Sequence, residues 1–318
     1  MTAFQKGITV SKAFQRGTNR MEEKQKPSLS ELRTILAGLG ISGVSESSVR
    51  AFVSEEDGSE YAVWMIEDGN TRKVLKQAKA YEMEAYRRFF TGRQPYFPSF
   101  LGSCQYKGQE YFLTEYFQGT DLRVCERKRL TLVLDALAEM QNEFWQRTDL
   151  YDACFTMEKA MEGIENRGRY LGSELLEKAY AKFEQVYRKT PRSLCHDDLL
   201  PINVLVNDEQ AVFIDWEYCG VLPYLGSFAR LIAHGRENIE SYFYMSAEDR
   251  EFAIAYYYNA VPKQHGISWE EFRHSLDYFL FYEYCEWIML GNRYGSRDER
   301  YGYYQNLAEQ LVQKLIQL

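Results

Sequence analysis

Polar residues at defined spacing distinguish one stretch of the chain, residues 194–217. His196 and Asp198 open it, and Asn203 follows Asp198 by five residues. Asp215 comes directly after a short apolar run near the end of the stretch. An amide oxygen and a carboxylate are the oxygen ligands that Mg²⁺ takes, and a separate carboxylate can accept a hydroxyl proton. We therefore interpret Asn203 and Asp215 as metal ligands and Asp198 as the proton acceptor of a phosphoryl transfer.

Two short apolar runs within this stretch predict a β-hairpin. The runs are Val204–Val206 and Ala211–Ile214, and the polar residues 207–210 join them. A hairpin of this kind brings Asn203 and Asp215 together at its open end. Turn chemistry alone is the alternative explanation, and it accounts for Asn203 but not for an aspartate that follows four apolar residues.

The pattern His-x-Asp-x4-Asn followed by Ile-Asp-Trp-Glu resembles the catalytic and metal-binding segments of the aminoglycoside phosphotransferase and choline kinase family. Over about residues 30–300, the resemblance implies an α+β, bilobal, protein-kinase-like fold with a small β-rich N-lobe and a larger, mostly helical C-lobe. It implies a kinase that uses ATP or GTP with Mg²⁺ to phosphorylate a hydroxyl of a small, amine-bearing molecule. His196 would then be a catalytic residue that orients the loop.

Three β-rich runs before this stretch predict the sheet of the N-lobe. They cover Val49–Val53, Tyr61–Ile66 and Arg72–Lys76, and a helix from about Ala78 to Phe90 follows them. This order of strands and then a helix resembles the nucleotide-binding lobe of kinase-like folds.

The first forty residues predict one short helix after an irregular segment. Residues 1–20 are basic with little apolar periodicity, and we expect them to be disordered. Met21 is an alternative start, and a weak targeting arm is another interpretation of the basic segment. The helix begins after Ser28, which forms a capping box with Glu31, and it ends at Gly40.

Lys76 corresponds, by the resemblance, to the lysine that contacts nucleotide phosphates. Glu82 on the following helix is its expected partner, and Glu84 is the alternative. A lysine that protects a sheet edge from aggregation is the structural explanation of the same residue. For the loop that cradles the phosphates we favour residues 43–48, whose serine hydroxyls can donate hydrogen bonds, over the acidic turn 55–58.

The apolar strand Tyr111–Phe117 resembles the strand and linker that join the two lobes. In that family the linker main chain meets the adenine ring, so Glu115 and Phe117 are candidates for nucleotide binding. The lobes then divide into a nucleotide-binding N-lobe, residues 21–118, and a catalytic and substrate-binding C-lobe, residues 119–318.

Helical periodicity dominates the rest of the chain. We predict helices over residues 130–144, 173–189 and about 269–290. After the hairpin, residues 225–234 resemble the family's segment with an aspartate that braces the catalytic loop, and the matching residue here is Ser227. This departure predicts a less rigid loop.

Acidic residues on the last predicted helix are candidates for binding the acceptor. Glu283 lies in an apolar stripe, and a buried carboxylate needs a partner. Glu283, Glu286 and Trp287 could line a pocket for an ammonium group. The alternative is that the acids pair with Arg293 or Arg297.

Composition limits the class of protein. A length of 318 residues suggests two lobes, and a formal net charge of −8 argues against a general nucleic-acid binder. The six cysteines contain no Cys-x-x-Cys pair and are interpreted as reduced. No apolar run approaches the roughly 18 residues of a membrane span, and no cleavable leader is evident. We expect a cytoplasmic protein without membrane or nucleic-acid partners, of unknown oligomeric state.

Two further hypotheses remain open at this point. A catalytically weak relative could serve as a binding or spore-coat-type structural protein, and the serine at position 227 favours it. A protein kinase ranks third, because no clear activation segment follows Asp215.

Overall fold

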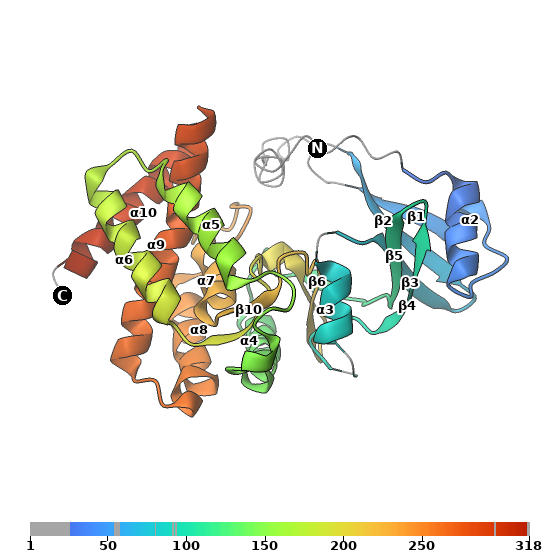
Figure 1. Cartoon of the computed structure of the whole chain (residues 1–318), viewed down its shortest axis with the longest axis horizontal. Coiled ribbons are helices and arrows are strands. Elements are labelled where there is room, and N and C mark those ends of the chain that lie inside the picture. The colour runs from blue at the N-terminus through green and yellow to red at the C-terminus, as the bar shows by residue number, and fades with distance from the viewer. Residues whose placement is uncertain are drawn as a thin grey trace.

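Two lobes make up the structure, a computed structural model (Figure 1). The small lobe is mostly sheet and the large lobe is mostly helical, which matches the predicted α+β class. The predictions for residues 1–20, for Met21 and for most of the turn 55–58 lie outside the described residues. The structure describes residues 26–53, 58–79, 81–90, 92, 94–295 and 297–316.

An antiparallel sheet of five strands forms the centre of the small lobe, in the order β1-β2-β3-β5-β4. The three predicted strands are present, and β5 is the strand predicted before the linker. β4 was not predicted, because it is an edge strand whose side chains are exposed or half-buried and whose sequence lacks a clear apolar alternation. The strands are β1 Val49–Val53, β2 Glu60–Asp68, β3 Thr71–Gln77, β4 Phe100–Tyr106 and β5 Gln109–Glu115.

Helix α2, Leu29–Gly38, packs beside this sheet and confirms the predicted capping box. The Ser28 hydroxyl accepts from the Glu31 N–H, and the Glu31 carboxylate accepts from the Ser28 N–H at 2.7 Å. The apolar face of α2 and the inner face of the sheet form a small separate core. Its buried members are Leu32, Ile35, Leu36, Ile41, Trp64, Ile66, Leu75, Tyr111 and Leu113.

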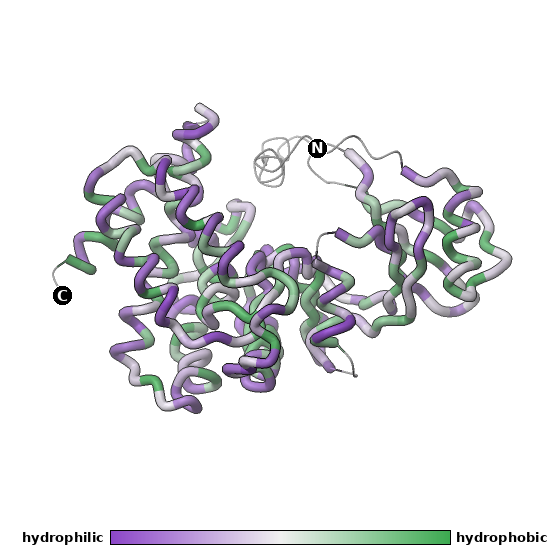
Figure 2. The backbone as a smooth tube through the Cα atoms, viewed as in Figure 1, coloured by the Kyte–Doolittle hydropathy of each residue, from purple (hydrophilic) through white to green (hydrophobic). Residues whose placement is uncertain are grey.

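Helix α3 spans Glu82–Arg88 and is shorter than predicted, because Ala78, Lys79 and Tyr81 lie outside the helix. Its buried side chains, including Met83 and Tyr86, belong to the core of the large lobe rather than to that of the sheet. In Figure 1, α3 accordingly lies between the two lobes. Hydrophobic segments occur in both lobes, in agreement with two clusters of buried side chains (Figure 2).

The large lobe is built from helices around short strands. The helices predicted over residues 130–144, 173–189 and 269–290 are confirmed as α4, α6 and α9. Its elements are β6 Thr120–Asp121, α4 Arg127–Glu143, α5 Met157–Gly168, α6 Glu174–Lys189, β7 Arg192–Cys195, β8 Val204–Val206, β9 Ala211–Phe213, β10 Gly220–Pro223, α7 Leu225–Ala233, α8 Ala247–Ala260, α9 Trp269–Tyr294 and α10 Glu299–Ile316.

The predicted hairpin is confirmed as β8 and β9. Val204 pairs with Phe213 and Val206 with Ala211, and β6 extends this sheet on the other side of β8. β7 pairs with β10 in a separate two-stranded sheet. The segment from the end of β7 to the residues just after the hairpin therefore carries all the residues of the pattern.

All six cysteines are free thiols, as predicted. Within the part of the chain that the structure describes, none of the helices has the length and apolar character needed to cross a bilayer.

Candidate active site

Lys76 lies between carboxylates from the two lobes. Its Nζ is 2.6 Å from Glu82 Oε1 and 2.7 Å from Asp215 Oδ1. Glu82 is almost completely buried, and the lysine side chain is 13% exposed. The predicted pairing with Glu82, rather than with Glu84, is confirmed.

Lys76 and Asp215 hold each other in the charged form, whereas burial raises the pKa of Glu82 in spite of its contact with Lys76. Burial alone would lower the pKa of Lys76, but Asp215 and Glu82 together hold that pKa above its ordinary value. Burial would raise the pKa of Asp215, but Lys76 and Lys79 outweigh it and hold that pKa below the ordinary value. Asp215 is therefore a carboxylate at neutral pH, which is the form that binds a cation.

Lys79 is a member of the site that sequence reasoning missed. Its Nζ lies 3.2 Å from Asp215 Oδ2 and 3.2 Å from Glu217 Oε2. Lys79 stands in the connection between β3 and α3, where no periodic pattern marks a functional side chain. Lys79 and Asp215 are 136 residues apart in the sequence, so their ion pair is evident only in the folded chain.

The first prediction concerns the buried pair. Lys76→Met should lower the free energy of unfolding by about 3–5 kcal/mol, because removal of one partner leaves the buried Glu82 charge uncompensated. Lys79→Met, whose side chain is 41% exposed, is the matched control and should cost at most about 1 kcal/mol. Urea unfolding of both variants measures the difference. Equal stabilities would contradict the buried pair, and adding Glu82→Gln to Lys76→Met should recover part of the loss.

The backbone at Asp215 has an unusual conformation. Its φ is +66°, a left-handed value that costs a residue other than glycine about 1–3 kcal/mol. Trp216, which follows, is completely buried and donates from Nε1 to the Phe213 carbonyl at 2.9 Å. The anchored tryptophan and the strained turn direct the Asp215 carboxylate toward Lys76 instead of continuing the strand.

Asn203 and Asp198 are joined across the catalytic loop. Asn203 Nδ2 donates to the Asp198 carbonyl at 2.8 Å and lies 3.4 Å from Asp198 Oδ2. This bond turns the Asn203 amide oxygen away from the aspartate. Burial raises the pKa of Asp198 to about 6, although the neighbouring Arg230 opposes the rise. The side chain remains 27% exposed, so an acceptor hydroxyl can reach it.

His196 is a buried, neutral support for the loop. Burial lowers its pKa to about 4, and Nε2 donates to the Ile214 carbonyl at 2.7 Å, which ties the loop to the end of the hairpin. The His196 backbone N–H donates to Ser227 Oγ at 2.9 Å. Ser227 therefore holds the loop with a neutral acceptor, and the expectation of a less rigid loop loses its main reason.

Glu115 and Phe117 in the linker remain candidates for contact with the nucleotide base. The Glu115 N–H donates to the Ser99 carbonyl at 2.9 Å, which leaves only its carbonyl for a nucleotide base. The Phe117 ring lies against Gly119, where an added Cβ would come within 2.5 Å of the ring. A glycine is thus required at 119, and contact of Glu115 and Phe117 with adenine stays a prediction.

The acids of α9 have a partner that the sequence did not indicate. Glu283 and Glu286 are 5% and 3% exposed, and both contact Arg230 rather than Arg293 or Arg297. Trp287 stacks on Tyr304 with ring centroids 5.6 Å apart. A role of Glu283, Glu286 and Trp287 toward the acceptor stays a prediction.

The sheet register bears on which segment could cradle the phosphates, and the location of that loop stays a prediction. The serine-rich residues 43–48 precede β1, whose first residue is level with Lys73. Lys76 lies three residues further on, toward the connection between β1 and β2. The register therefore favours that connection, of which residues 54–57 lie outside the described part, over the serine-rich segment.

Comparisons with known proteins agree with this geometry. The profile of the phosphotransferase enzyme family (APH) matches residues 47–273. Two forms of protein LicA from Haemophilus influenzae are each 22% identical over 200 residues, which is 60% of this chain and 72% or 57% of those proteins.

Solved structures show the same fold at low identity. The choline kinase LicA from Streptococcus pneumoniae has a TM-score of 0.54 and 13% identity, covering 89% of this chain and 98% of that chain. A thermostable mutant of aminoglycoside phosphotransferase APH(4)-Ia, in a ternary complex with AMP-PNP and hygromycin B, has a TM-score of 0.58 and 16% identity, with the same coverage. The predicted protein-kinase-like fold is confirmed.

Proposed function

This chain belongs to the phosphotransferase enzyme family and is a small-molecule kinase, and from that premise we propose that it transfers the γ-phosphate of ATP or GTP, with Mg²⁺, to a hydroxyl of a small, amine-bearing molecule. The observation that carries the proposal is the meeting of four side chains from both lobes. Lys76 reaches Asp215 at 2.7 Å, while Asn203 joins the same hairpin to Asp198.

The donor set fits a magnesium ion. Asp215 is held as a carboxylate by Lys76 and Lys79, and the amide oxygen of Asn203 is turned away from Asp198. Both are oxygen donors, and two protein ligands suit an ion that keeps phosphate oxygens and waters in its shell. When bound, Mg²⁺ would neutralise charge on the nucleotide phosphates.

The chain's own residues divide the remaining work. The acceptor oxygen bonds to the γ-phosphorus while the bond from that phosphorus to the nucleoside diphosphate breaks, and the hydroxyl proton passes to Asp198. With its pKa near 6, Asp198 is ionised at neutral pH and can accept that proton. Lys76 would bind a phosphate oxygen, and His196 would keep the loop in place.

Charge favours an amine-bearing acceptor. Asp198, Glu283 and Glu286 contact the guanidinium of Arg230, and Arg167 is a second guanidinium near Glu286, so the carboxylates of this group outnumber the guanidinium groups. An ammonium group near these residues would reduce that excess. The relatives described above include a choline kinase and an aminoglycoside phosphotransferase, both named for acceptors that carry amines.

The second prediction concerns metal and nucleotide together. Asn203 and Asp215 supply too few ligands to hold Mg²⁺ alone, so the melting temperature should rise only when Mg²⁺ and ATP or GTP are both present. At a ligand concentration of 100 times Kd the stabilisation is about 2.7 kcal/mol. Thermal unfolding with each component alone and with both measures it. Equal stabilisation by Mg²⁺ alone would contradict the site.

A direct test of the proposed function uses purified protein and radiolabelled ATP or GTP. The acceptor panel pairs each amine-bearing molecule with a hydroxyl compound that lacks the amine, among amino alcohols, aminoglycosides and sugars. Phosphorylation confined to the amine-bearing members supports the proposal. Transfer to none of them, by a protein that binds Mg²⁺ and nucleotide, contradicts it.

A further inference from the structure

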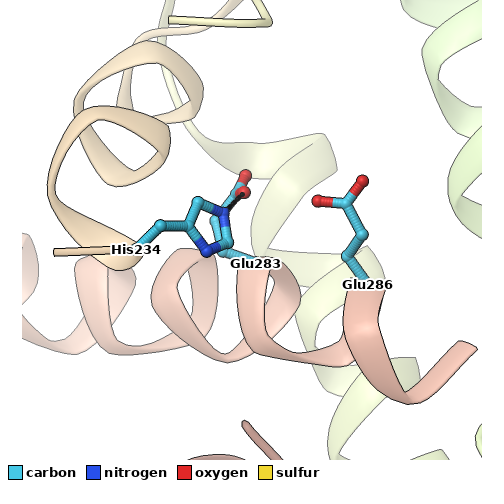
Figure 3. A group of neighbouring side chains, drawn as sticks. All are labelled: His234, Glu283 and Glu286. Atoms are coloured by element: carbon cyan, nitrogen blue, oxygen red, sulfur yellow. Dashed lines mark hydrogen bonds and ion pairs between the residues drawn. The ribbon is translucent and has the colours of Figure 1, made fainter. Parts of the chain in front are cut away.

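Three ionisable side chains converge in the interior of the large lobe. His234 follows α7, and Glu283 and Glu286 lie one turn apart on α9; Figure 3 shows both carboxylates on the same side of that helix, with His234 leaning toward Glu283. One ligand atom of each residue lies within 4.8 Å of the others, a spacing that a metal ion could use. Whether a cation of the protein itself already lies between these side chains decides how the cluster should be interpreted.

Arg230 supplies the cation at this position. Its Nη1 donates to Glu283 Oε2 at 2.8 Å, contacts Glu286 Oε2 and lies 3.4 Å from His234 Nε2. Burial alone would lower the pKa of Arg230, but the surrounding carboxylates hold that pKa well above its ordinary value. A metal ion here would have to displace a permanently charged, buried guanidinium, so the cluster is better explained as the binding site of the Arg230 side chain.

The other edge of the same guanidinium faces the catalytic loop. Nη2 and Nε of Arg230 lie 2.9 and 3.2 Å from Oδ1 of Asp198. Both donors share one carboxylate oxygen, whereas Oδ2 faces Asn203 Nδ2 at 3.4 Å. The arginine thus ties the proposed proton acceptor to α9, and the two oxygens of that acceptor are no longer equivalent.

We propose that Arg230 is a positioning residue for phosphoryl transfer, which holds Oδ1 of Asp198 so that Oδ2 is presented to the acceptor hydroxyl. The proposal rests on the proposed function, because it takes Asp198 as the base. Glu283 and Glu286 act through Arg230: they fix the plane of the guanidinium and thereby the direction of its fork. Misplacement of a reacting group by about 1 Å can cost about 10²-fold in rate, so this support affects turnover.

An arginine suits this task better than a lysine. A guanidinium presents a planar set of donors at fixed angles, and one plane can reach Asp198 on one edge and both glutamates on the other. The ammonium group of a lysine is a point charge on a flexible stem. Arg230→Lys keeps a positive charge beside the glutamates but loses the pair of hydrogen bonds to Asp198.

The test compares Arg230→Lys and Arg230→Met with the parent enzyme. We expect turnover to fall about 10-fold or more for Lys and further for Met, while the KM for Mg·ATP stays within about twofold, since Arg230 bonds to Asp198, Glu283 and Glu286. The acceptor is the most active member of the panel, or water, measured as ATP hydrolysis, if none is phosphorylated. Arg188→Met is the matched control, because Arg188 is exposed on α6, pairs with Glu165 and should leave turnover unchanged.

A double variant separates positioning from simple damage to the fold. If Arg230 acts through Asp198, then Arg230→Lys should not slow an enzyme that already carries Asp198→Asn, because the two effects are not additive. A general structural role would multiply the losses instead. Where Arg230→Met does not fold because two buried acids lose their partner, the triple variant with Glu283→Gln and Glu286→Gln removes those charges as well.

The possible results separate the two proposals. Normal turnover in Arg230→Lys beside a slow Asp198→Asn would overturn the positioning role and leave the proposed function intact. Multiplied losses in the double variant would also overturn it. Normal turnover in Asp198→Asn itself would instead remove the base on which both proposals depend.

Discussion

Asp198→Asn should reduce turnover by about 10²–10⁴-fold and leave the binding of Mg²⁺ and nucleotide nearly unchanged. A positioned base contributes a factor of this order to a proton transfer. The amide keeps the shape of the carboxylate, but it cannot take up the hydroxyl proton. Asp198 contacts Arg230 and Asn203 rather than Lys76, so its loss should spare the phosphate side of the site.

Turnover and thermal shift of the same Asp198→Asn preparation measure this result. Asp208→Asn is the matched control, because Asp208 is fully exposed on the turn between β8 and β9 and its loss removes a charge without touching the site. A variant that binds nucleotide poorly yet reaches the parent's maximal rate would show that Asp198 is not the base.

Asp215→Asn should have the opposite pattern and abolish the stabilisation that depends on Mg²⁺. An amide is a weaker ligand for a hard cation than a carboxylate, and removal of one preorganised charge from a reacting centre costs about 10²–10³-fold in rate. Asparagine tolerates the left-handed backbone at this position, so the turn should persist. Lys76 keeps Glu82 as a partner, which limits the effect on folding.

Titration of the Asp215→Asn protein with ATP, with and without Mg²⁺, measures this loss. The parent should bind more tightly with the metal, and the variant should bind equally weakly in both cases. Retention of the full metal effect would assign the ion to other ligands. Together the two aspartate variants separate proton transfer from metal binding.

Local patterns in the sequence predicted the parts of the fold and site that depend on neighbouring residues. The capping box of α2 and the β8–β9 hairpin follow from spacing within a few positions. The pair of Lys76 and Glu82 is only six residues apart, at the end of a strand and the start of a helix. Such features depend on the local sequence and not on contacts between distant segments.

Contacts between distant segments could not be predicted from one sequence. Arg230 lies in the largely apolar segment LGSFARLIA. A single charged residue in such a segment is usually interpreted as lying on the exposed side of a helix. The glutamate partners of Arg230 lie 53 and 56 residues further on, and their own sequence context suggested nearer arginines. The choice between the two candidate phosphate loops depends on a similar long-range feature, because strand register decides which end of the sheet lies beside Lys76.

The separate cores of the two lobes have a consequence for how the protein unfolds. α2 and one face of the five-stranded sheet form the smaller core, whereas α3 and Phe112 on the other face of the sheet belong to the larger core. Partial unfolding follows the boundaries of packed clusters, so opening of the smaller core should have to break the contacts of Phe100 and Phe112 with Tyr86 on α3. The ion pairs of Lys76 with Glu82 and Asp215 then connect the two packed clusters. A nucleotide bound across this boundary would raise the cost of opening the small lobe, and so couple substrate occupancy to the local stability of the sheet.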